Sequence, residues 1–478
     1  MSKSSNSAAQ CLYNWALCIA MLATLATLAA CGGNSAANDN ANGSTENSLL
    51  PGNSLVAITT ATLASRQALV DHMEDRYLWY QDLPALDISL SKYADLRVLL
   101  DDLRKQPEDR FSVLIDTAAQ QQRIEGGVSG SYGLRFTERT SGDAQTNEGI
   151  DIRIAGVNDF GSVALAGIQR GDRIIGAEGK SIEELGLDGF REIFTEPGLG
   201  VERSLQIRHP DGSEQNYTIR RTEHPLNPVR KQAIFTDPDT GRRVGYVLVE
   251  EFIRLTSEQL ETFRADYASL GLDDLIIDLR YNGGGLVSAS RDLASSVYGQ
   301  GQVDDIYTTL QRNDKHTNEN FTFHFRQFDN AFMSLERVFI LTTRSTCSAS
   351  EEVINGLKPF MDVITIGDVT CGKPYASRSY NLIADLVSAN VLDSRSVNAL
   401  GEGDFFEGIT PTCLAADDPI LPYNDPRESL VSVALHYAEF NECPITEPLR
   451  QVLGLRNPSE NYSMPITDEE RSQGAILP

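Results

Sequence analysis

Basic residues are scarce in this chain of 478 residues. It has 41 Lys and Arg against 67 Asp and Glu, which gives a formal net charge of −26. The acidic residues are spread along the chain, and such a surface repels the phosphates of nucleic acids and anionic lipids. Nucleic acid is therefore excluded as the main partner. The length predicts two or three domains rather than a single core.

Histidine is scarce as well, and metal-binding spacings are lacking. The chain has six His, and none of them, nor a second Cys, lies at ligand spacing from the cysteines of its second half. We therefore expect no metal site and no cofactor. The glycine run at 283–285 lacks the Lys-Ser or Lys-Thr pair that follows a phosphate loop, which argues against nucleotide binding.

A membrane-spanning run is lacking too, although the N-terminus is apolar. Residues 17–30 carry no charge but are too short to span a bilayer, and with Lys3 ahead of them they predict a secretory signal peptide over residues 1–30. The sequence Leu-Ala-Ala-Cys at 28–31 resembles the lipobox of bacterial lipoproteins, which implies lipidation of Cys31. The alternative is a plain signal peptide followed by an incidental cysteine.

The segment after Cys31 is rich in Gly, Ser, Asn and Ala. Residues 31–54 have too few bulky apolar side chains to form a core, so they predict a flexible tether. The expected location is the bacterial cell envelope, held by the lipid anchor. Gly32, in place of an Asp after the lipidated cysteine, favours the periplasmic side of the outer membrane.

Four cysteines follow the predicted signal and tether: Cys347, Cys371, Cys413 and Cys443. An oxidising compartment permits disulfides, and four cysteines allow three pairings. We favour Cys347 with Cys371 and Cys413 with Cys443, because each is the pair closest in sequence. Free thiols are the alternative.

Hydrophobic periodicity divides the rest of the chain and predicts an α/β multidomain fold. Residues 55–125 have helical spacing, and residues 126–223 have short strands separated by glycine turns. Residues 224–445 alternate apolar strands with amphipathic helices, which predicts an α/β core. Residues 446–478 are a polar C-terminal extension.

The strand-rich region 126–223 resembles a PDZ domain. The resemblance is carried by Ala-Gly-Ile-Gln-Arg-Gly-Asp at 166–172 and by the loop Gly133, Leu134, Arg135 and Phe136. In that family the corresponding loop offers N–H groups to the C-terminal carboxylate of a peptide, which then adds a strand to the sheet edge. A domain of this kind that serves only as a spacer or a lid is the alternative.

A candidate nucleophile lies where an apolar run, residues 338–341, is followed by the small-residue turn 344–352. A strand, a turn and then a helix would place the Ser348 hydroxyl at a helix N-terminus, where N–H groups stabilise a developing oxyanion. The other interpretation is an ordinary helix cap, since Ser348 with Glu351 forms a capping-box pattern.

A candidate general base follows the next apolar strand, at Lys373. A lone Lys after Gly is usually solvated, but at the end of a buried strand its pKa would be lowered, and a neutral Lys activates a serine. A bridge between Cys347 and Cys371 would bring Ser348 and Lys373 together. His316 and His324 have no supporting motif as alternative bases.

With these residues in view, the chain resembles the C-terminal-processing, or tail-specific, serine peptidase family. Three motifs carry the resemblance: Ser-Ala-Ser-Glu at 348–351, Gly-Lys at 372–373, and Leu-Arg-Tyr-Asn-Gly-Gly-Gly at 279–285. It implies that Ser348 is the nucleophile and Lys373 the base. Backbone N–H groups of Gly284 or Gly285 and of Ala349 would hold the oxyanion.

This sequence departs from the family's motifs at two positions, and the family's residue roles cannot be carried over there. The family's Gln four residues after the lysine is Ser377 here, and its Asn-Pro-Gly-Gly is Asn-Gly-Gly-Gly at 282–285. Ser377 is a possible third catalytic group. The implied function is a membrane-anchored serine endopeptidase acting on polypeptides, and the alternatives are a non-catalytic peptide-binding lipoprotein and an ester hydrolase. Oligomeric state and substrate are left open.

Overall fold

The computed structural model describes most of the chain between the predicted tether and the C-terminal extension, namely residues 57–140, 149–196, 198–299, 304–328, 333 and 335–444. The predicted signal peptide with Cys31, the tether and the extension 446–478 lie outside the described residues. Within those ranges, none of the helices combines the length and apolarity needed to cross a membrane.

Residues 57–125 are mainly helical. Asp95 caps a short amphipathic helix by accepting a hydrogen bond from Arg97 N, and Asp116 caps another by accepting from Ala119 N. The elements are α3 (Leu63–Arg76), η1 (Tyr80–Asp82), η2 (Ser91–Ala94), α4 (Leu96–Leu103), β1 (Val113–Asp116) and α5 (Thr117–Ile124).

Residues 126–225 form a β-rich region with its own hydrophobic core. Its sheet has the order β3-β4-β5-β7-β8, with β6 beside β5, and β2 pairs with β9. Among the described strands, β3 therefore lies at a sheet edge. The elements are β2 (Val128–Ser131), β3 (Leu134–Thr140), β4 (Ile150–Val157), α6 (Ser162–Leu165), β5 (Arg173–Ala177), β6 (Lys180–Ser181), α7 (Ile182–Glu192), β7 (Glu202–Arg208), β8 (Glu214–Arg220) and β9 (Thr222–Pro225).

A second, mostly parallel sheet forms the centre of the α/β core, in the order β10-β11-β12-β15-β16-β19. The strands from β11 onwards are parallel, and β10 is antiparallel to β11. These elements are β10 (Val229–Thr236), β11 (Arg243–Val249), α8 (Arg254–Ala268), β12 (Asp274–Asp278), α9 (Val287–Tyr298), β15 (Arg337–Thr342), α10 (Ala349–Leu357), β16 (Asp362–Gly367), β19 (Cys413–Leu414) and α11 (Ser429–Phe440).

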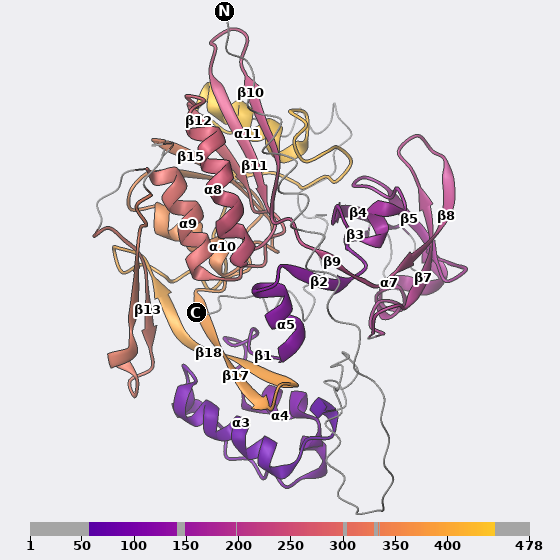
Figure 1. The fold of residues 1–478 in the computed structure, drawn as a ribbon, viewed down its shortest axis with the longest axis vertical. Coiled ribbons are helices and arrows are strands. Elements are labelled where there is room, and N and C mark those ends of the chain that lie inside the picture. The colour runs from indigo at the N-terminus through magenta and orange to yellow at the C-terminus, as the bar shows by residue number, and fades with distance from the viewer. Residues whose placement is uncertain are drawn as a thin grey trace, which may run out of the picture. The chain divides into compact units, whose positions relative to one another are not determined.

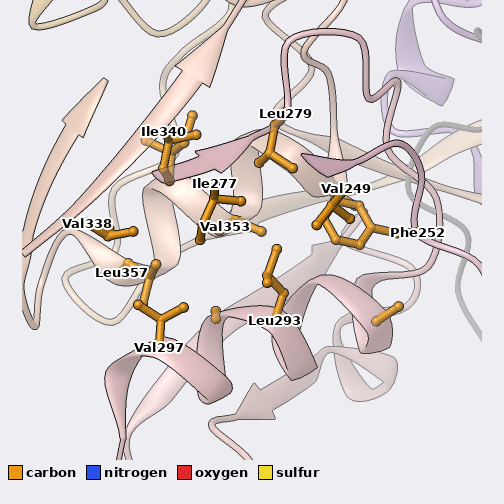
Figure 2. Packing of buried hydrophobic residues seen from close by; sticks show 14 of the residues in the cluster. Val249, Phe252, Ile277, Leu279, Leu293, Val297, Val338, Ile340, Val353 and Leu357 are labelled. Atoms are coloured by element: carbon orange, nitrogen blue, oxygen red, sulfur yellow. The ribbon is translucent and has the colours of Figure 1, made fainter. Parts of the chain in front are cut away.

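Helices cover both faces of this parallel sheet (Figure 1). On one face, Ile277 and Ile340 pack into a cluster with residues of α8, α9 and α10, part of which Figure 2 shows. On the other face, Ile276 and Phe339 pack with residues of α11. Alternate side chains of one strand thus enter opposite clusters, which is why the inner residues of β12 (275–277) and of β15 (338–341) are all apolar.

An antiparallel sheet completes the fold, in the order β1-β18-β13-β14 with β17 beside β18. Through β1, which pairs with β18 from Val113 opposite Asn390, the mainly helical N-terminal region joins this sheet. The mixed α/β architecture is the predicted one. The elements are β13 (Ile306–Arg312), η3 (Thr317–Glu319), β14 (Phe321–His324), β17 (Tyr375–Ile383) and β18 (Val387–Val397).

Candidate active site

Three loops meet at the carboxyl ends of adjacent strands of the parallel sheet. The glycine loop follows β12, the Ser348 turn follows β15, and the loop with Lys373 follows β16. Because β12, β15 and β16 are adjacent and parallel, their carboxyl ends lie side by side. Ligand sites in open parallel sheets form outside these carboxyl ends. The topology therefore brings together the three segments that the sequence singled out.

Ser348 is the cap residue of α10 and is fully buried. Its φ of 57° is unusual for a residue with a side chain, and backbone strain of this type costs about 1–3 kcal/mol. The turn is held in place from the glycine loop, because Cys347 N and Ser350 Oγ both donate to the carbonyl oxygen of Asn282, over 3.1 and 2.9 Å. The helix N-terminus behind Ser348 favours negative charge there.

Glu351 connects the Ser348 turn to the lysine loop. Its Oε2 atom accepts from Ser348 N and Lys373 N, each over 2.8 Å, and its Oε1 atom accepts from Gly372 N over 2.8 Å and from Thr370 Oγ1. Burial raises the pKa of this carboxyl, while the donors favour its charged form. The sequence identified Glu351 only as half of a capping box, and its role as the acceptor shared by both loops was missed.

The disulfide Cys347–Cys371 joins the same two loops, with the Cα atoms 5.1 Å apart. The second disulfide, Cys413–Cys443, joins β19 to the segment after α11. These are the two pairings that the sequence favoured. The first bridge and the shared carboxylate together place the backbones of Ser348 and Lys373 next to each other.

Lys373 is buried, with 2% of its surface exposed. Burial lowers the pKa of its ammonium group to about 8, although the carboxylates of Asp109 and Glu351 oppose this shift. The Nζ atom lies 5.4 Å from the centre of the Phe111 ring. A substantial fraction of Lys373 is therefore neutral in mildly alkaline solution, as a general base must be.

The glycine loop lies directly against Ser348. A Cβ atom on Gly284 would lie 3.0 Å from Ser348 Cβ and 3.2 Å from Ala349 N, and φ is 110° at Gly284 and 129° at Gly285. Only glycine fits here without strain. Gly284 N donates to Asn282 Oδ1 over 2.9 Å. Of the two alternative oxyanion donors in this loop, Gly284 is thus engaged, and Gly285 is the better candidate, together with Ala349 at the start of α10.

Ser377 is buried in β17, opposite Leu392 of β18. Its part in positioning Lys373 stays a prediction. His316 contacts Asp75 and Glu319, and His324 contacts the carbonyl oxygen of Asp304. Both histidines are thus engaged away from the three loops.

The predicted peptide-binding loop lies at the start of β3. Gly133 has a φ of 71° and donates its N–H to Ser131 Oγ over 3.1 Å, while Leu134 and Phe136 belong to β3 itself. Arg135 reaches the glycine loop and donates from Nη1 to the carbonyl oxygen of Tyr281 over 3.2 Å.

Asp109 near Lys373 was missed altogether, since an isolated Asp some 260 residues away in the chain carries no sequence signal. Asn282 belongs to the motif at 279–285, but the motif did not predict its hydrogen bonds with Val249 O and Gly284 N, which depend on the fold.

A buried serine at a helix N-terminus, a buried lysine and a close glycine loop are groups that acyl transfer can use. Residues 243–414 match the family model described as Peptidase family S41, and residues 64–113 match that of the Peptidase S41 N-terminal domain. Two parts of the chain are therefore similar to peptidase family S41.

Curated relatives agree with these matches. A carboxyl-terminal-processing protease of Synechocystis is 29% identical over 211 residues, which cover 44% of this chain and 46% of that protein. The carboxy-terminal processing protease CtpB of Bacillus subtilis is 24% identical over 301 residues, covering 57% and 59%. This chain spans about half the length of the curated relatives it matches.

A solved structure shares the fold. The crystal structure of an S41 protease candidate from Bacteroides fragilis superposes with a TM-score of 0.62 at 24% identity, over 78% of this chain and 97% of that one. The likeness extends beyond the segments that the family models match.

Proposed function

We propose that the protein is a serine endopeptidase in which Ser348 is the nucleophile and Lys373 the general base. One observation carries the proposal: a single oxygen of Glu351 accepts the backbone N–H groups of both residues. A capping residue of a structural helix does not need a buried lysine, a shared carboxylate and a close glycine loop around it. In a Ser/Lys site for acyl transfer, the lysine supplies the base, the glycine loop supplies an oxyanion donor, and the carboxylate places the two loops.

The reaction begins with neutral Lys373. Its Nζ takes the proton of Ser348 Oγ while Oγ forms a bond to the carbonyl carbon of the scissile peptide, and the N–H groups of Gly285 and Ala349 stabilise the resulting oxyanion. The C–N bond then breaks, and Lys373 returns the proton to the departing amine. In the second half, Lys373 takes a proton from water, the hydroxide attacks the acyl-enzyme, and Ser348 leaves with that proton.

We further propose that residues 126–223 act as a PDZ-type domain that binds or gates the substrate C-terminus. The edge position of β3 supports this, since an extended peptide adds as a strand to an open edge.

Lipidation of Cys31 and location in the bacterial envelope belong to the same proposal and rest on residues 28–31. The test is a Cys31→Ser variant, which lacks the lipidation site and should be released from isolated envelopes, and unchanged membrane retention would contradict the proposal.

The experiment for the enzymatic proposal uses the full chain in detergent with an unstructured polypeptide. We expect cleavage by wild type and a loss of at least about 10³-fold in Ser348→Ala. Absence of cleavage by wild type, together with retained binding of the polypeptide, would support the second candidate, a non-catalytic peptide-binding protein, which the missing glutamine at Ser377 favours. A small ester in the same assay separates peptidase from esterase activity.

A further inference from the structure

The segment from Asp109 to Ser112 lies beside the lysine loop. Asp109 is fully buried, and its Oδ1 atom accepts from Phe111 N over 3.0 Å and from Ser112 N over 2.8 Å. Its Oδ2 atom accepts from Tyr77 Oη over 2.8 Å. Three donors thus fix the position of the carboxylate.

The segment 109–112 contacts the lysine loop at two points. The ring of Phe111 lies 5.4 Å from Lys373 Nζ. Arg110 Nη2 donates to the carbonyl oxygens of Cys371 and Phe406, over 2.7 and 3.2 Å. The N-terminal region therefore holds both the backbone of the loop, through Arg110, and the lysine ammonium, through the aromatic ring.

Two carboxylates favour the charged form of Lys373 among the described residues: Asp109, which has the larger effect, and Glu351. Glu351 already accepts hydrogen bonds from three backbone N–H groups and a hydroxyl. Arg110 is the cation of the same segment, and its guanidinium donates hydrogen bonds to backbone carbonyls. Asp109 is thus the main acidic neighbour of the lysine side chain.

We propose that Asp109 and Phe111, supplied by the N-terminal region, are positioning residues that hold the Lys373 side chain in the site. This is the task that the resemblance assigns to the family's glutamine, whose position Ser377 occupies here. The description of Lys373 as a base rests on the proposed function, but its placement against Asp109 and Phe111 does not.

The test is the titration of Lys373 itself. The chain has only eight Lys, so selective 13Cε labelling of lysine gives few NMR signals, and Lys373→Arg assigns the relevant one. All variants are made in the Ser348→Ala background, which prevents self-cleavage and makes the readout independent of activity. A failed peptidase assay and a failed positioning role are then distinguishable results.

We expect Asp109→Asn to lower the titration midpoint of Lys373 by about one pH unit, because a carboxylate that favours the ammonium form is removed. Asp109→Glu keeps the charge and should restore the midpoint. Glu108→Gln is the matched control, since this neighbouring carboxylate is exposed, and it should leave the midpoint in place. A folded Asp109→Asn variant with an unchanged midpoint would overturn the proposal.

Phe111→Leu provides a second route if Asp109→Asn does not fold. Removing the ring from beside the ammonium should lower the midpoint by about half a pH unit, because a cation–π contact favours the charged form of the lysine. An unchanged midpoint in this variant would also overturn the proposal. In the active background, the acid limb of kcat/KM should move in the same direction, whereas a purely structural role would lower the rate without moving that limb.

Discussion

The two disulfides of this protein cross-link regions of very different character. Cys347–Cys371 spans 24 residues and joins the loops that carry Ser348 and Lys373. Cys413–Cys443 spans 30 residues and joins a short edge strand to the exposed end of the described chain. Chain entropy makes the two bridges nearly equivalent for folding, at about 3 kcal/mol each. Of the two bridges, the first alone has a proposed catalytic residue next to each of its cysteines.

The comparison indicates that a disulfide affects function only where the residues next to it belong to the site. Near the first bridge, Glu351 accepts hydrogen bonds from both bridged loops. No comparable buried carboxylate connects the segments at the second bridge among the described residues. Bridge and carboxylate therefore act together in the first region, and each can be removed separately.

The largest effect is expected from Glu351→Gln. An amide has one acceptor oxygen where the carboxylate has two, so backbone donors of Ser348, Gly372 or Lys373 lose their partner. Misplacement of catalytic groups by about 1 Å costs about 100-fold in rate, and we expect kcat/KM to fall by at least that factor. Steady-state kinetics checks this, with Glu352→Gln as the neighbouring control. Activity within threefold of wild type would show that the bridge alone aligns the site.

Removing the bridges compares the regions directly. Cys347→Ser with Cys371→Ser should lower kcat/KM about tenfold, since Glu351 still ties the loops, and should lower the free energy of unfolding by about 3 kcal/mol. Cys413→Ser with Cys443→Ser should cause a similar loss of stability with little change in kcat/KM. Denaturant unfolding and kinetics on both double variants measure this. Equal losses of activity would remove the distinction between the bridges.

The smallest effect on kcat/KM is expected at Glu352, which follows Glu351 on α10. Burial raises its pKa to about 7. A raised pKa contributes stability below the unfolded value near 4.5 that is lost as the pH rises through 7, so ionised Glu352 destabilises the protein in alkaline solution. Glu352→Gln should therefore be about 3 kcal/mol more stable than its parent at pH 8, with a smaller gap at pH 5. Unfolding in the Ser348→Ala background tests this, and a gap that does not change with pH would refute it.

The sequence predicted the parts of the fold that local patterns encode. Apolar runs located β12, β15 and β16, and glycine spacing located the loop at 283–285, because strand burial and positive φ leave direct marks on residue choice. Sequence proximity also predicted both disulfides. These features depend on short stretches of chain or on few alternatives.

The rest of the site depends on distant contacts. Asp109 lies beside Lys373 because β1 pairs with β18 and carries the N-terminal region to the lysine loop. The engagement of Gly284 N by Asn282 Oδ1 depends on loop conformation, which the motif alone leaves undetermined. Long-range contacts of this kind have no local signature, so the sequence could name Ser348 and Lys373 but could not name what holds them.

Phosphonylation of Ser348 as a function of pH tests the central proposal most directly. The wild-type protein and Lys373→Ala are treated with a serine-reactive fluorophosphonate, and the modified residue is identified by mass spectrometry. We predict modification at Ser348 whose rate rises through a midpoint near pH 8, in line with the lowered pKa of Lys373, and loss of that modification in Lys373→Ala. Equal rates of Ser348 modification in the two proteins would contradict the assignment of Lys373 as the base.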